Sequence, residues 1–212
     1  MADTRAIMAV GEAIANLLRA AYDPADFPTP LDLTTTTTEQ IRNGAPNAGV
    51  TLLIYRVTPS GTHRSPVGRT DTNGRRFRTQ LPVDVHILMT VWGTEPTLQH
   101  AIAGWAMRTL EDTPLLPSGA LNAAVGGSFR AEEAVELGLA ELSNEDMFRI
   151  WEVLNLNIYQ LSIPYVARTV RIESVEYLSE RGGPPVQERR QDIGVLEPVD
   201  AFNPPADGGQ RP

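Results

Sequence analysis

The hydrophobic and polar positions in the N-terminal part of the chain change from a helical period to a strand period. Residues 5–21 repeat apolar side chains at steps of three and four, which predicts an amphipathic helix with one buried stripe. Residues 31–38 hold leucines followed by five consecutive threonines. Because threonine is β-branched, we expect a strand there with a polar face, at an edge of a sheet. Residues 50–57 are apolar on both faces, which predicts a central strand.

The clearest strand pattern covers residues 83–92. Its odd-numbered positions are all apolar and form one face, whereas Asp84, His86 and Trp92 lie on the other. The rest of the pattern predicts a helix over 95–111, a helical turn over 118–125, a strand over 133–140, a short helix after a capping box at Ser143–Asp146, and a strand over 161–172 in which Pro164 marks an edge or a bulge.

The composition changes at Ser179, because 11 of the last 34 residues are glycine or proline. We therefore predict an α+β fold with a single compact domain over 1–178, in which about three helices pack on a mixed or antiparallel sheet. For residues 179–212 we predict an extended C-terminal arm. Its apolar patch, Ile193, Gly194, Val195 and Leu196, has the length of a strand that is donated to a neighbouring sheet, and the alternative is a disordered tail.

The chain has 212 residues, 42% of them hydrophobic, and no cysteine. The missing cysteines exclude disulfides, thiolate zinc sites, iron–sulfur clusters and cysteine nucleophiles. No apolar run approaches the ~18 residues of a membrane span, and we expect no secretory signal. The net charge of −8 argues against a general nucleic-acid binder.

Positive charge is concentrated in one segment, although the chain as a whole is acidic. All 18 positive residues are arginine, and five of them fall within residues 64–78, beside a single aspartate. The pair Asn73-Gly74 predicts a β-hairpin there. The segment is either a solvated hairpin or a basic hairpin that docks on an acidic partner. The five arginines are Arg64, Arg69, Arg75, Arg76 and Arg78.

Catalytic chemistry has little support in the sequence. The best metal candidate is Asp84-x-His86, which places two ligand types on one strand face, and the alternative is a hydrogen-bonded pair on a half-buried face. No phosphate-binding loop and no nucleophile elbow occur. The sequence predicts no catalytic residue and no cofactor, and the pattern is typical of a component of an assembly.

Several stretches resemble one family in order and spacing over roughly residues 5–176. They include AIMAVGEAIANLLRAAY, GVTLLIYRVTPSGTHRS and the most specific pieces, LP-x-D-x-H-x-L-x-T-x-W-G and D-T-P-L-L-P. These stretches resemble the tail-terminator, or cap, proteins of phage-tail-like contractile injection systems, of the antifeeding-prophage and Photorhabdus virulence cassette type.

The resemblance implies a structural role without turnover. Such proteins form a six-membered ring on the inner tube and sheath at the end distal to the baseplate, where they stop polymerisation. The implied partners are the inner tube protein, the sheath protein and further copies of the chain. The same resemblance implies assembly in the cytoplasm as part of an injection particle, and it leaves open whether that particle is later released. The C-terminal extension is implied to engage the sheath.

Two other functions remain alternatives at this point. One is the neck or terminator protein of a contractile phage tail, and the other is a small metal-dependent enzyme that uses Asp84 and His86. The predicted partner interface consists of Arg75, Arg76, Arg78, Ile193, Val195 and Leu196.

Overall fold

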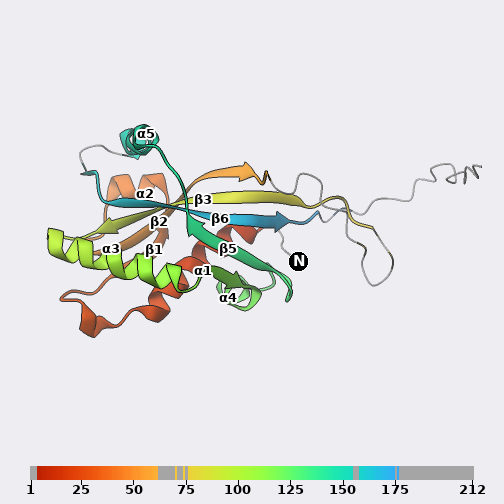
Figure 1. The fold of residues 1–212 in the computed structure, drawn as a ribbon, viewed down its shortest axis with the longest axis horizontal. Coiled ribbons are helices and arrows are strands. Elements are labelled where there is room, and N and C mark those ends of the chain that lie inside the picture. Colours follow the sequence, from red (N-terminus) through yellow and green to blue (C-terminus); the bar gives the residue numbers. More distant parts are fainter. Residues whose placement is uncertain are drawn as a thin grey trace, which may run out of the picture. The chain divides into compact units, whose positions relative to one another are not determined.

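One mixed sheet with helices on both faces makes up the described part of the chain (Figure 1). The computed structural model describes residues 4–61, 70, 74, 76–154, 158–174 and 176. The strand order is β1-β2-β3-β6-β5-β4, in which β1 is parallel to β2 and the other neighbours are antiparallel. The strands are β1 (Asp32–Thr36), β2 (Gly49–Pro59), β3 (Leu81–Trp92), β4 (Leu115–Pro117), β5 (Ala134–Leu139) and β6 (Ser162–Ile172).

The two faces of the sheet carry different helices (Figure 1). The face with the main core is covered by α1 (Ala6–Ala21), α3 (Pro96–Glu111) and α4 (Ser118–Ala124). The opposite face carries the short helices α2 (Thr38–Asn43) and α5 (Asn144–Leu154) over a second, smaller core. A 3-10 turn, Pro24–Asp26, follows α1. The predicted fold class is confirmed, with five helices instead of about three.

β3 shows how the alternation of the sequence becomes two cores. Its odd-numbered side chains from Val83 to Val91 are buried in the main core below α1 and α3. Leu88 and Trp92 face the other way and pack against Trp151 of α5 in the second core. Both faces of the strand therefore contribute to a core, although Asp84 and His86 on the second face are only half-buried.

β1 lies at an edge of the sheet, as predicted, and β2 is its one neighbour among the described strands. The pairing begins at Asp32 and Gly49, which has a φ of +140°. A Cβ at position 49 would lie 2.0 Å from the Asp32 carbonyl oxygen, so the two backbones approach this closely only because residue 49 is glycine.

β1 is shorter than the predicted strand because a helix begins at its end. The Thr37 hydroxyl accepts the Gln40 N–H, and the Gln40 carboxamide accepts the Thr37 N–H at 2.9 Å, which is a complete capping box for α2. At α5 the Ser143 hydroxyl accepts the Asp146 N–H at 3.0 Å, as in a capping box. The Asp146 carboxylate, however, accepts the Ser143 hydroxyl, whereas in a complete capping box it would accept the Ser143 N–H.

β6 contains Pro164 although it lies between β3 and β5. The Pro164 carbonyl accepts the Ala140 N–H at 2.9 Å, directly after β5 ends at Leu139. Since the N and C=O of a strand residue point to the same side, the missing N–H faces the end of β5, which is a local edge. The bulge of β6 lies elsewhere, at Arg168 and Thr169.

The predicted boundary between residues 1–178 and 179–212 stays a prediction, because the arm lies outside the described residues. Among those that are described, no helix is long and apolar enough to cross a bilayer.

Candidate functional site

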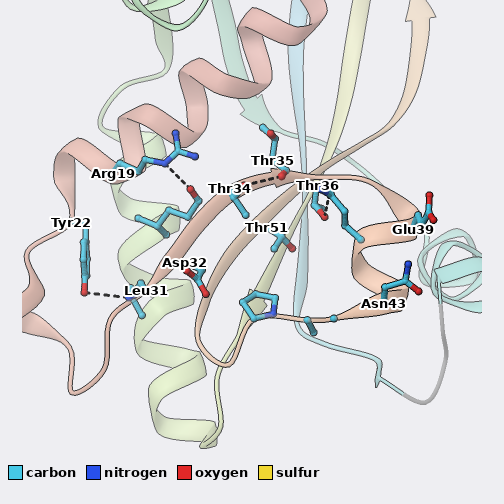
Figure 2. Close-up of a pocket in the computed structure, with 15 residues that line it drawn as sticks. Arg19, Tyr22, Leu31, Asp32, Thr34, Thr35, Thr36, Glu39, Asn43 and Thr51 are labelled. Carbon is cyan, nitrogen blue, oxygen red and sulfur yellow. Dashed lines mark hydrogen bonds between the residues drawn. The ribbon is translucent and has the colours of Figure 1, made fainter.

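An open groove with a volume of about 1060 Å³ runs along the outer edge of β1 (Figure 2). One wall is formed by the C-terminal end of α1, with Arg19 and Tyr22, and the other by α2 and the residues after it. The floor is the threonine-rich strand itself, so the lining is mainly polar. The groove therefore exposes the backbone of an edge strand, which is the kind of surface on which protein chains pair.

The direction of the β1 backbone groups follows from one bond. The Asp32 N–H donates to the Ala48 carbonyl at 3.0 Å, toward β2. Because successive residues of a strand point to opposite sides, the backbone groups of Leu33 and Thr35 face the groove.

Side chains of the same chain occupy four of the backbone groups that line this edge. Two of these side chains come from α1 and its end, one from β1 and one from α2 (Figure 2). Each of these side chains forms a hydrogen bond with a backbone N–H or C=O group that an additional strand would otherwise bind. The bonds are Arg19 Nε to the Leu33 oxygen at 2.8 Å, the Leu31 N–H to the Tyr22 hydroxyl at 3.3 Å, the Thr34 hydroxyl to the Thr35 oxygen at 2.9 Å, and the Thr37 N–H to Gln40 Oε1 at 2.9 Å.

Arg19 is held in this position by its own helix. Its Nη1 donates to Asn16 Oδ1 at 2.7 Å and lies 3.8 Å from Glu12 Oε2. Glu12 in turn accepts the Thr35 hydroxyl proton. Positions 12, 16 and 19 share one helix face, so a polar stripe of α1 lies against β1. Sequence reasoning missed this contact, although the stripe spacing was a signal for it.

Asp84, half of the metal candidate, has a structural role. It lies on β3 opposite the bulge of β6, and its Oδ1 accepts the Thr169 N–H at 2.8 Å. Thr169 has a φ of +58°, which is a rare conformation for a β-branched residue. The Asp84 carboxylate therefore stabilises a strained bulge.

His86 binds different partners. Its Nε2 lies 3.4 Å from Arg56 Nη2 and 3.3 Å from the Thr58 hydroxyl. Its Nδ1 is buried and has no hydrogen-bond partner among the described residues. Burial, followed by the nearby charge of Arg56, lowers the pKa of His86, and Asp84 opposes this shift. The neutral ring is thus the favoured form.

The donor set of this region does not form a metal site. No group of three histidine, aspartate or glutamate side chains within the described ranges is arranged to hold a metal ion. Asp84 is already engaged with backbone and His86 with Arg56 and Thr58. The arrangement gives the alternative of a metal-dependent enzyme no support.

The predicted partner interface is described only in part. Arg76 and Arg78 are exposed, and Arg76 forms an antiparallel bridge with Thr70. Arg78 is 3.1 Å from a Glu176 carboxylate oxygen in a solvent-exposed ion pair. Gly74, between the bridge residues in the sequence, has a φ of +78°, a conformation that favours glycine, and the predicted two-residue turn at Asn73-Gly74 stays a prediction because Asn73 and Arg75 lie outside the described residues. Outside the described residues lie Arg75, Ile193, Val195 and Leu196.

A buried ion pair was not predictable from the sequence. The Arg130 guanidinium binds the Glu173 carboxylate, whose side chain is only 5% exposed. Gln80 donates to the same carboxylate at 2.8 Å. The pair joins the loop before β5 to the end of β6, and no local pattern links two residues this far apart in the sequence.

Comparisons with known proteins identify a family and two solved structures with a similar fold. The model of the family described as the Pvc16 N-terminal domain matches residues 9–188. The cryo-EM structure of the PVC sheath/tube terminator of an extracellular contractile injection system, in the extended state, is 16% identical with a TM-score of 0.54, and the match covers 96% of this chain and 64% of that one. The anti-feeding prophage tube-terminating cap is 16% identical with a TM-score of 0.50, over 79% of this chain and 55% of that one.

At this identity the two solved structures establish a shared fold. The chain spans less than two thirds of the length of either of them. No curated protein sequence matches the chain.

Proposed function

The chain belongs to the Pvc16 N-terminal domain family, and from this premise we propose that it is the tube and sheath terminator of a contractile injection system. The observation that carries the proposal is the family match over residues 9–188, together with a fold shared with two terminator structures. The proposed partners are the inner tube protein and the sheath protein of the same particle.

The proposed assembly is a ring of six copies on the distal end of the tube. A closed ring needs two different patches on each subunit, because its contacts are heterologous. Segregated charge is one source of such patches: the chain carries −8 overall, while segment 64–78 is basic. We propose that Arg75, Arg76 and Arg78 face an acidic layer of the particle and fix the register of the ring.

The proposed terminator acts without turnover. Asp84, which the sequence offers as a metal ligand, is used to hold backbone, and the groove along β1 is an open edge instead of an enclosed pocket. Both features suit a protein that works by binding and blocking. For the C-terminal arm, we propose that Ile193, Val195 and Leu196 pair with the sheath.

Electron microscopy of particles from a strain without this protein tests the proposal. We expect tubes and sheaths of uncontrolled length or without attached distal sheath, and normal particles when the wild-type gene is restored. A reconstruction of wild-type particles should place this chain, in six copies, in the last distal layer. Particles of normal length and complete sheath from the deletion strain, or a different symmetry of that layer, would contradict it.

A further inference from the structure

The two end strands of the sheet are both poorly suited to pairing. An edge strand normally presents a row of free N–H and C=O groups, and a second chain can add to it. β4, at one end of the order, has three residues and ends at Pro117, which has no N–H to donate. β1, at the other end, is longer and lies in an open groove, so another mechanism must protect it.

Side chains of the same chain bind the two outward carbonyls of β1. Arg19 occupies the Leu33 oxygen and the Thr34 hydroxyl occupies the Thr35 oxygen (Figure 2). The outward N–H groups of Leu33 and Thr35 have no partner among the described residues. A strand added to this edge would accept bonds from the outward N–H groups and donate bonds to the outward carbonyls, so it would first have to displace the side chains of Arg19 and Thr34.

We infer that Arg19 and Thr34 cap the edge of β1 and prevent it from pairing with the β1 edge of a second copy of this chain. Arg19 is held by Asn16 and Glu12, so its bond to the Leu33 oxygen is preorganised and a second strand would have to break it. The two outward N–H groups, of the buried Leu33 and the half-buried Thr35, are too few to bind a strand alone. This inference concerns the described domain and does not rest on the proposed function.

The variant Arg19→Met/Thr34→Val removes both caps while it keeps side chains of similar length and shape. Arg108→Met is the matched control, because Arg108 is an exposed arginine of α3 that is paired with Asp112 and lies outside the groove. Sedimentation velocity over a concentration series measures self-association, and circular dichroism checks the fold. We expect the double variant to associate about tenfold or more tightly than the wild type, and Arg108→Met to match the wild type.

A third change shows whether the new contact uses this edge. Adding Thr35→Pro to the double variant removes an outward N–H without removing a bond to β2, and we expect it to reverse the association. Any ring that forms through other surfaces should be unaffected by these changes, so failure of the ring proposal and failure of this inference are distinguishable.

Amide hydrogen exchange of the wild type tests the inference without any variant. The Leu33 and Thr35 amides should exchange on the order of tenfold or more faster than those of Thr34 and Thr36, which face β2. Equal protection of all four amides would mean that the edge is already paired, and this would overturn the inference. A folded double variant with wild-type association would overturn it as well.

Discussion

Replacing Asp84 with alanine is expected to lower the free energy of unfolding by about 2 kcal/mol. The carboxylate accepts the Thr169 N–H at 2.8 Å, and a hydrogen bond to a charged group contributes ~1.5–3 kcal/mol. Because Asp84 is half-buried, part of this loss is recovered from water, which places the estimate in the middle of that range. Asp84→Asn retains an acceptor oxygen and should cost about half as much, since neutral bonds are roughly half as strong. Urea unfolding followed by tryptophan fluorescence measures both variants.

Thr169→Gly provides the matched test of the strained bulge. A positive φ costs threonine ~1–2 kcal/mol of stability, and glycine removes this cost. Glycine also gives the unfolded chain more conformational freedom, which lowers the stability of the variant by ~0.4–1 kcal/mol. The variant should therefore be more stable than the wild type by roughly 0.5–1 kcal/mol. Asp84→Ala with wild-type stability would refute the structural role of the carboxylate. If Asp84→Asn lowers the free energy of unfolding as much as Asp84→Ala does, the negative charge of Asp84 matters more than its hydrogen bond to the Thr169 N–H.

Three further changes test other parts of the structure. Burial lowers the pKa of His86, so the unfolded chain binds a proton that the folded chain does not, and stability should fall as the pH drops through about 6.5. In urea titrations across this range, His86→Gln should lose that part of the pH dependence, and identical slopes would contradict the assignment. Trp151→Ala should cost ~3–5 kcal/mol because Trp151 is fully buried in the second core; calorimetry showing a loss under about 1 kcal/mol would mean that the core does not depend on it. Reversal of Arg75, Arg76 and Arg78 to glutamate should change stability by no more than ~0.5 kcal/mol each, while electron microscopy shows uncapped particles; normal particles would indicate a solvated hairpin.

The strands with strict alternation were predictable because their periodicity is the physical cause of their burial. Residues 83–92 are the best case: the odd positions reach the main core and Leu88 and Trp92 reach the second. The first helix was equally clear, since its apolar stripe is what packs on the sheet. The predicted helix over 95–111 also forms, as α3, and it buries Ala103 and exposes Ala101 because the elements packed against a helix decide which of its faces is buried.

Features that depend on contacts between distant residues were not predictable. The pair Arg130–Glu173 and the bond from Asp84 to the Thr169 N–H exist only once β3, β5 and β6 are side by side. The helix α2 was missed for a local reason. Its capping box is hidden in the threonine run, where strand propensity and helix capping favour different structures, and the structure places the change at Thr37.

The threonine run explains why one segment is both a strand and a poor template for another strand. The β-branched side chain favours the extended backbone of β1. The same side chain carries a hydroxyl that reaches a nearby carbonyl, as Thr34 does with the Thr35 oxygen, or a carboxylate, as Thr35 does with Glu12. Valine would favour the strand equally and leave the outward carbonyl free. Threonine at this edge therefore provides strand propensity together with a hydroxyl that occupies an outward carbonyl.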